Sequence, residues 1–174
     1  MEAACRQDRK QSEGPHAAEE RGEALNRFLV EVFQEILKTE EACLARERPD
    51  LSLRELHLIE EICRAVDLGR DNRATAIAAA RRVTAGTLTV SVNLLVKKGY
   101  LERRKDPGDG RVVRLFPTQR AREANEAHAR FHRAMVEEIL TVLSEREASS
   151  FARGLQAVAA FFHAKLNDTE ENQP

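Results

Sequence analysis

Two histidines one helical turn apart have the spacing best suited to chemistry in this chain. His128 and His132 stand at positions i and i+4, so a helix would carry both imidazoles on one face, where they can share a metal ion. A zinc site is therefore one interpretation of the pair. A buried hydrogen-bonded or interface role is the commoner one for such residues, and a surface position also stays open.

The cysteines do not extend that site. Cys5, Cys43 and Cys63 are odd in number and lack CxxC spacing, which favours a reduced, cytoplasmic compartment. Cys63 falls on the apolar side of its predicted helix, where an inert core thiol is expected rather than a redox sensor. No signal peptide is visible and no apolar run approaches the roughly 20 residues of a membrane span. We therefore expect a cytoplasmic protein with no membrane partner.

Catalytic motifs are absent from the sequence. It contains no GxSxG, HExxH, phosphate-binding loop or dinucleotide fingerprint. Its carboxylates recur at helical spacing with arginine partners, which is the pattern of a solvated helix face. We therefore expect no enzymatic activity.

The stretch between Thr84 and Gly99 predicts a helix with one apolar and one polar face. The apolar positions recur at 0, 4, 7 and 8, namely Leu88, Val92, Leu95 and Val96. Thr87, Asn93 and Lys97 lie opposite, where they can reach base edges and phosphates. Thr84 is placed to cap the start of this helix and Gly99 to end it.

A basic hairpin follows this helix, and a short helix precedes it. The segments YLERRK and RVVRLF flank DPGDG at residues 106–110, which is strong turn chemistry. Helix, turn, helix and hairpin make a winged helix, whose usual ligand is duplex DNA. Trp is absent and Tyr occurs once, so stacking on single strands is not expected.

Charge is concentrated in the same region. The chain has net charge −1, but residues 70–122 hold 13 basic and 4 acidic residues, a net +9, which leaves −10 elsewhere. This asymmetry indicates a module for a polyanion on an acidic scaffold, although a solvated charged face is the alternative.

The flanking segments are mostly helical. Residues 1–20 are predicted to be a disordered arm and residues 167–174 a loose tail. A helix from Ala24 carries a broad apolar stripe, and capping boxes at Ser52 and Ser144 start two later helices. We expect a mainly α (α+β winged helix) fold: residues 51–117 bind DNA, and a helical region of residues 21–50 and 118–166 forms a homodimer.

The chain resembles the MarR family of bacterial transcription regulators. The resemblance rests on VTAGTLT at residues 83–89, on LVKKGYLER at residues 95–103 and on the wing pattern Asp109-x-Arg111. Residues 86–106 and 128–136 most resemble the branch that represses fatty-acid synthesis. Two positions differ from the usual pattern: Arg81 stands where members have leucine, and Val90 where many have a basic residue.

The resemblance implies roles for individual residues. Arg111 would enter the minor groove, held by Asp109. Physical chemistry agrees, because a narrow minor groove concentrates negative potential that attracts arginine. Thr87, Thr89 and Asn93 would face the major groove or its phosphates. The expected DNA contacts are Thr84, Gly86, Thr87, Thr89, Val90, Asn93, Lys97, Arg103, Asp109 and Arg111.

The effector is less well defined by the sequence. Apolar residues at Leu56, Ile59, Phe131 and Met135 suit an acyl chain, and they suit a core equally well. Zinc-uptake repressors of the family place ligands at positions like His57, His128 and His132. No clear fourth ligand accompanies them, and three are too few for a closed structural site.

These observations predict a homodimeric regulator that binds a pseudo-palindromic operator in double-stranded DNA. The resemblance adds repression of fatty-acid synthesis genes, an acyl-type effector and acyl carrier protein as a partner. One alternative is a zinc-responsive repressor of the same family. Another is a helical interaction protein without DNA, which leaves the net +9 segment unexplained.

Overall fold

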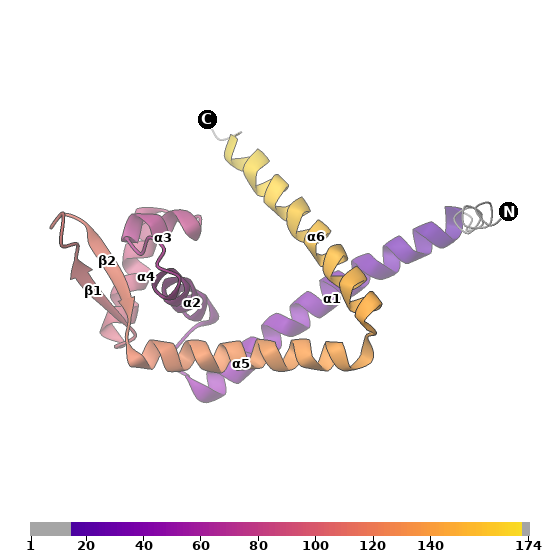
Figure 1. Cartoon of the computed structure of the whole chain (residues 1–174), viewed down its shortest axis with the longest axis horizontal. Coiled ribbons are helices and arrows are strands. Elements are labelled where there is room, and N and C mark those ends of the chain that lie inside the picture. Colours follow the sequence, from indigo (N-terminus) through magenta and orange to yellow (C-terminus); the bar gives the residue numbers. More distant parts are fainter. Residues whose placement is uncertain (1–14, 172–174) are drawn as a thin grey trace. The chain divides into compact units, whose positions relative to one another are not determined.

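The computed structural model describes residues 15–171, which form helices and one small antiparallel sheet (Figure 1). The elements are α1 (Pro15–Glu47), α2 (Leu53–Asp67), α3 (Ala74–Ala80), α4 (Ala85–Lys97), β1 (Leu101–Lys105), β2 (Val113–Pro117), α5 (Gln119–Val142) and α6 (Glu145–Glu171). The predicted class, mainly helical with a two-stranded wing, is confirmed.

The chain divides into two compact units, residues 1–125 and residues 126–174. The first holds α1 to α4, the sheet and the start of α5. The second holds the rest of α5 and α6. The boundaries predicted for DNA binding and dimerisation concern partners rather than compactness, and they stay predictions.

The core of the first unit joins α2, α4 and the two strands. Ile59 and Ile62 of α2 and Leu95 of α4 are fully buried, as are Leu115 of β2 and Tyr100 just before β1. Burying one such aliphatic side chain contributes about 1.5–3 kcal/mol, so this cluster holds α4 and the sheet on α2.

Both predicted capping boxes are present. At the start of α2, the backbone N–H of Glu55 donates to Ser52 Oγ over 3.3 Å, and the N–H of Ser52 donates to the Glu55 carboxylate over 2.8 Å. Ser144 and Glu147 repeat the arrangement before α6. These side chains satisfy N–H groups that a helix start leaves without partners.

Two predicted boundaries differ from the structure. Residues 15–20 belong to helix α1 rather than to a disordered arm; residues 1–14 lie outside the described range. Helix α6 continues to Glu171, five residues into the predicted loose tail, and residues 172–174 are not described.

The turn between α3 and α4 is closed by an arginine. Arg82 has φ 51°, in the left-handed region where glycine is usual. Its N–H donates to Ala79 O, and the N–H of Val83 donates to Ala78 O, both over 3.0 Å. This pair of bonds ends α3 and sets the direction of the chain into α4.

A third backbone segment lies against the wing. Strands β1 and β2 pair antiparallel with Arg103 opposite Leu115. On the other edge of β2, the N–H of Leu115 donates to Asn72 O over 3.0 Å, and Arg73 bridges Arg114. The wing is therefore bound to the segment that leads into α3.

Polar contacts attach the first turn of α5 to the rest of the first unit. Thr118 Oγ1 donates to Gly99 O over 2.8 Å. Arg120 donates to Asp50 over 2.9 Å, and Arg122 donates to Asp67 over 2.8 Å. These contacts join the end of the wing to the loop before α2 and to the last turn of α2.

Candidate nucleic-acid interface

One face of α4 is exposed along its whole length. Leu88, Val92 and Leu95 are buried on the other side, as the spacing predicts. Exposed positions on α4 and at its cap include seven of the expected DNA contacts: Thr84, Gly86, Thr87, Thr89, Val90, Asn93 and Lys97. Val96 differs from the expectation, because it is 36 % exposed. It lies at the edge of the apolar stripe, about 80° around the helix from Leu88.

The threonine hydroxyls on this face have partners within the helix. The N–H of Thr87 donates to Thr84 Oγ1 over 3.1 Å, which confirms the predicted cap. Thr89 Oγ1 donates to Ala85 O over 2.7 Å. Since a hydroxyl has one donor and two acceptor positions, Thr89 presents a methyl group and an acceptor to a ligand. Those groups suit a thymine methyl or an exocyclic amine in the major groove.

Asn93 and Arg103 form one polar pair, although they belong to different elements. Arg103 of β1 donates through Nη1 to Asn93 Oδ1 of α4. The remaining donors of both side chains lie at the exposed surface. Two residues that the sequence placed separately in the interface therefore present a single group of donors.

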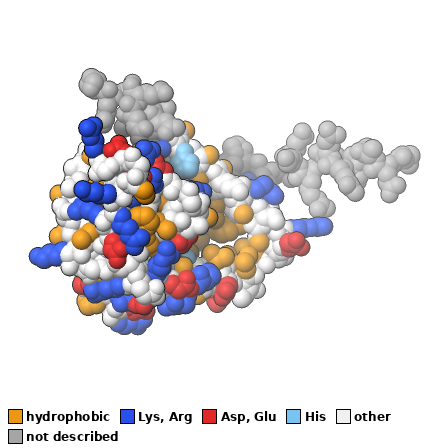
Figure 2. Space-filling view, turned by 60° about the vertical axis from the view of Figure 1, so that its left-hand side comes forward, with side chains coloured by type: hydrophobic (Ala, Val, Ile, Leu, Met, Phe, Trp, Pro, Cys, Tyr) orange, Lys and Arg blue, Asp and Glu red, His pale blue; other side chains and the backbone are white. Residues whose placement is uncertain are grey.

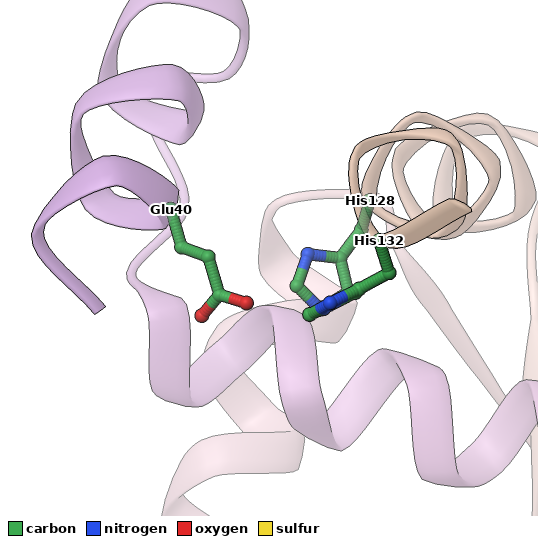
Figure 3. Close-up of side chains that lie close together, drawn as sticks. All are labelled: Glu40, His128 and His132. Atoms are coloured by element: carbon green, nitrogen blue, oxygen red, sulfur yellow. The ribbon is translucent and has the colours of Figure 1, made fainter. Parts of the chain in front are cut away.

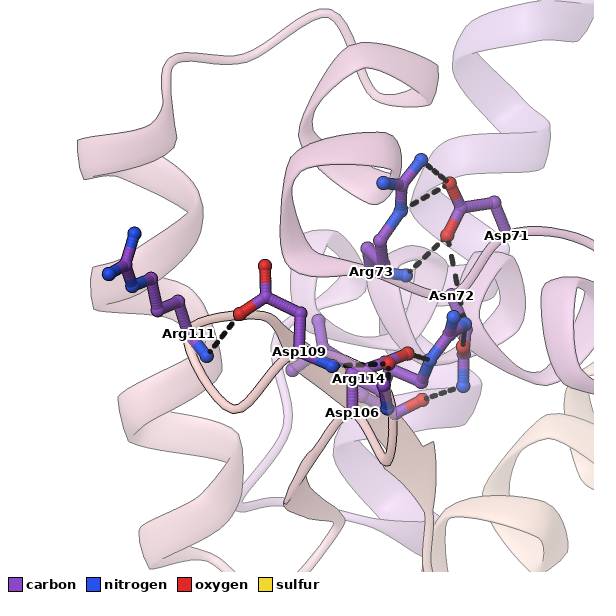
Figure 4. Close-up of polar contacts among 9 residues, drawn as sticks. Asp71, Asn72, Arg73, Asp106, Asp109, Arg111 and Arg114 are labelled. Carbon is purple, nitrogen blue, oxygen red and sulfur yellow. Dashed lines mark hydrogen bonds and ion pairs between the residues drawn. The ribbon is translucent and has the colours of Figure 1, made fainter.

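Asp109 holds Arg111 at the wing tip through a backbone contact. Asp109 Oδ1 accepts the backbone N–H of Arg111 over 2.9 Å (Figure 4). Asp109 thus fixes the backbone at Arg111 and leaves its guanidinium unpaired within residues 15–171. In Figure 4 the Arg111 side chain extends away from the other labelled residues.

Behind the tip lies a group of residues that the sequence reasoning missed. Asp106 accepts from the Arg114 guanidinium, and Arg114 also donates to Asn72 Oδ1 over 2.8 Å (Figure 4). The hydrogen bonds from Arg114 and from the N–H of Gly108 hold the pKa of the Asp106 carboxyl below its usual range. The pattern DPGDG signalled Asp106 as a turn residue only, and nothing in the sequence pairs it with Arg114.

Many basic side chains of the net +9 segment already have carboxylate partners. The pairs are Arg73–Asp71, Lys98–Glu55, Arg104–Glu102, Arg114–Asp106, Arg120–Asp50 and Arg122–Asp67. Lys97, Lys105 and Arg111 are exposed, and no ion pair holds them within the described range. Figure 2 shows Lys and Arg side chains spread over this end of the first unit, with a few acidic ones between them.

The two histidines at i and i+4 touch in the second unit. Their Nε2 atoms are 3.1 Å apart and their rings meet edge to face (Figure 3). The ring of Phe131 meets that of His132 edge to face. One ring can donate to the other, or both nitrogens can face one ion, for which bonds of about 2.0–2.1 Å imply a separation near 3.3 Å. In the first unit His57 Nε2 lies 4.0 Å from Glu40 of α1.

The expected effector contacts fall in two environments. Leu56 and Ile59 are core residues of the first unit, at 2 % and 0 % exposure. Phe131 and Met135 lie on α5 in the second unit and are half-buried. Cys63 is buried as expected, and burial raises the pKa of its thiol to about 11, so the thiolate that would react is scarce at neutral pH.

Comparison with known families and structures agrees with the resemblance to the MarR family. A profile described as the MarR family matches residues 50–112. No curated protein matches the chain. Among the helices of residues 15–171, none combines the length and the apolar character that crossing a membrane requires.

Solved structures give longer matches. FabT of Streptococcus pneumoniae in complex with DNA is 36 % identical, covering 82 % of this chain and 97 % of that chain, with a TM-score of 0.75. A MepR–DNA complex from S. aureus is 19 % identical over 78 % of this chain and 96 % of that chain, with a TM-score of 0.62. A MarR mutant from E. coli complexed with operator DNA is 22 % identical over 78 % and 93 %, with a TM-score of 0.57. The last two show the fold alone.

Proposed function

The chain belongs to the MarR family of DNA-binding winged helix-turn-helix transcription regulators, and from this premise we propose that it binds a pseudo-palindromic operator as a homodimer and represses genes of fatty-acid synthesis. As a member of that family it is a transcription regulator and not an enzyme. The observation that carries the proposal is the 36 % identity to a relative crystallised with DNA.

The roles proposed for the interface follow from exposure and charge. Helix α4 would lie in the major groove with Thr87, Thr89 and Asn93 toward the bases. Lys97 would meet a phosphate, and Arg111 of the wing the minor groove. Exposure of all these side chains and the absence of an acidic partner for Arg111 in the described residues support this assignment.

Operator binding can be tested by gel retardation of duplex DNA at two salt concentrations. We expect Arg111→Ala to weaken binding by about 1–3 kcal/mol without unfolding the protein. Lys97→Ala should weaken operator and random DNA alike and reduce the salt slope by about 1, since it removes one phosphate contact. Arg104→Ala is the matched control, because Arg104 is already paired with Glu102. Unchanged affinity for Arg111→Ala would exclude the wing from the groove.

Exposed apolar side chains support the homodimer. Helix α1 exposes Leu25, Phe28, Leu29, Val30 and Phe33, and α6 exposes Phe151, Leu155, Phe161 and Phe162. An apolar face of this kind on each helix is rare on monomers. A second copy of the chain would cover residues 21–50 and 118–166, and would put two winged helices on one duplex.

Regulation by an acyl group is the finer part of the proposal. The resemblance of residues 86–106 and 128–136 to the fatty-acid-synthesis repressor branch supports it, together with the identity to FabT. Phe131 and Met135 are half-buried and accessible to an acyl chain. Leu56 and Ile59 are packed in the core, so they would join such a contact only if side chains of α2 rearranged.

A zinc-responsive repressor is the second candidate, because the Nε2 atoms of His128 and His132 lie 3.1 Å apart. The acyl-responsive and zinc-responsive repressors differ in their expected response to ligand and to pH. Acyl groups on carrier protein should change operator affinity, and DNA must then change carrier affinity by the same factor. Zinc binding needs neutral imidazoles, so it should weaken as pH falls through the histidine range.

One titration separates the two effectors. Labelled operator and protein are titrated with acylated carrier protein, then with zinc, for the wild type and for the double variant His128→Ala, His132→Ala. We expect a response to the acylated carrier in the wild type. A zinc response that the double variant loses, with no acyl response, would replace the acyl proposal by the zinc one.

A further inference from the structure

Asp106 holds the two ends of the wing turn with one carboxylate. Its Oδ1 accepts the backbone N–H groups of Gly108 and Asp109, over 2.8 and 3.2 Å. Its Oδ2 accepts from the Arg114 guanidinium on the returning strand. The tip between β1 and β2 is thus fixed to the start of β2 through a single side chain.

Arg114 continues this connection into the body of the first unit. Its Nη1 donates to Asn72 Oδ1 over 2.8 Å and lies 3.9 Å from Asp71. Asn72 is 6 % exposed, and its Nδ2 donates to Leu115 O over 2.9 Å. Because residue 72 immediately precedes the segment that enters α3, the wing is bound to the helix-turn-helix by side chains as well as backbone.

The connection ends at the proposed groove contact. Asp106 orients the N–H of Asp109, and Asp109 Oδ1 in turn accepts the N–H of Arg111. Every link from Asn72 to the Arg111 backbone is therefore a hydrogen bond or ion pair (Figure 4). The Arg111 guanidinium is the only part of this series that extends away from it in the figure.

We propose that Asn72, Asp106 and Arg114 are positioning residues, which place the Arg111 side chain relative to α4 and thereby set how much affinity Arg111 adds to operator binding. This inference rests on the proposed role of Arg111 in the minor groove. The three residues act through Arg111 rather than as DNA contacts. Asn72 is buried, and the charge of Arg114 is already paired with that of Asp106.

The distinction between positioning and stability requires a double-mutant cycle. Arg111→Ala and Arg114→Gln are measured singly and together by operator retardation, with the full-length protein. We expect each single variant to lose about tenfold or more, which is the size of one groove contact. In the Arg114→Gln protein, Arg111→Ala should then cost less than about threefold, because the backbone that places the Arg111 side chain is no longer fixed by the network.

A parallel cycle pairs Arg114→Gln with Lys97→Ala, a phosphate contact on α4 that the network does not reach. We expect the fold losses of operator affinity of the two single variants to multiply in the double variant, which means that the two sites act independently. Arg104→Gln serves as the control for removing an exposed wing arginine, and its affinity should stay within about twofold of wild type. Thermal melting of the free protein monitors the fold of every variant.

Asp106→Asn is the second route, since it retains an oxygen for the turn N–H groups and removes only the charge that binds Arg114. It should reproduce the Arg114→Gln cycle. The inference is overturned if Arg111→Ala causes the same fold loss of operator affinity in the Arg114→Gln and Asp106→Asn proteins as in the wild type. It is also overturned if Lys97→Ala couples to Arg114→Gln as strongly as Arg111→Ala does. A lack of effect of Arg111→Ala in the wild type would instead remove the proposed wing contact itself.

Discussion

At the residue scale, Arg82 adopts a strained backbone conformation in the turn of the helix-turn-helix. Within residues 15–171 it is the one non-glycine with positive φ, 51°. A side chain in this region costs about 1–2 kcal/mol through the clash of Cβ with backbone. The bonds that end α3 hold the residue there regardless.

Substitution by glycine should therefore have opposite effects at two neighbouring arginines. We expect Arg82→Gly to leave the free energy of unfolding unchanged or to raise it by up to about 1 kcal/mol, because strain relief offsets the extra freedom of glycine. Arg81, at φ −85°, has no strain to lose, and Arg81→Gly should lower it by about 0.5–1 kcal/mol. Urea unfolding of both variants without DNA checks this. An equal decrease in the free energy of unfolding for Arg82→Gly and Arg81→Gly would show that the left-handed conformation of Arg82 carries no strain.

At the scale of the element, the start of α2 shows a cap that also joins two helices. Glu55 closes the capping box with Ser52 and receives Lys98, from the end of α4, over 2.7 Å. Burial by itself raises the pKa of Glu55, but the hydrogen bonds from Lys98 and Ser52 outweigh it and leave the pKa below its usual value. Ionised Glu55 thus stabilises the folded state.

Because folding lowers the pKa of Glu55, the stability that this residue contributes depends on pH. The contribution is fully present above the pKa of an unfolded glutamate, about 4.3, and is lost as pH falls through the lower folded-state pKa. We expect Glu55→Gln to reduce the free energy of unfolding at pH 7 by about 1–2 kcal/mol, and the difference from wild type to shrink toward pH 3. Glu147→Gln, which disturbs a capping box without a lysine, should cost less. A difference independent of pH would contradict this role of the Glu55 charge.

Local patterns predicted these elements well where the signal lies within a few residues. Ser52, Thr84 and Ser144 cap as expected, because their partners stand three residues away. The Asn72–Arg114 contact joins positions 42 apart, and only the folded chain determines which polar groups meet at that distance. Val96 was misassigned for a different reason: periodicity gives the centre of an apolar face more reliably than its edge.

At the scale of the whole molecule, the apolar faces of α1 and α6 lead to a prediction about assembly. Phe33 is 63 % exposed on α1, inside the proposed dimer region. We expect Phe33→Glu to convert a dimer into a monomer at micromolar concentration, and to weaken operator binding more than one lost contact would, because two half-sites are no longer linked.

Light scattering measures the mass of each variant. Leu68→Glu is the control, since Leu68 is 59 % exposed at the end of α2, outside that region, and it should remain dimeric. A wild-type mass of one chain at the same concentration would exclude both the dimer and the two-half-site operator.

The pairing of basic side chains with carboxylates also bears on how fast such a regulator finds its operator. At least six of the 13 basic residues in positions 70–122 pair with a carboxylate of the same chain, and each of these carboxylates reduces the attraction of its partner for a phosphate of arbitrary sequence. We therefore expect each encounter with random DNA to be shorter, and the search for an operator faster, than for a surface of 13 unpaired cations.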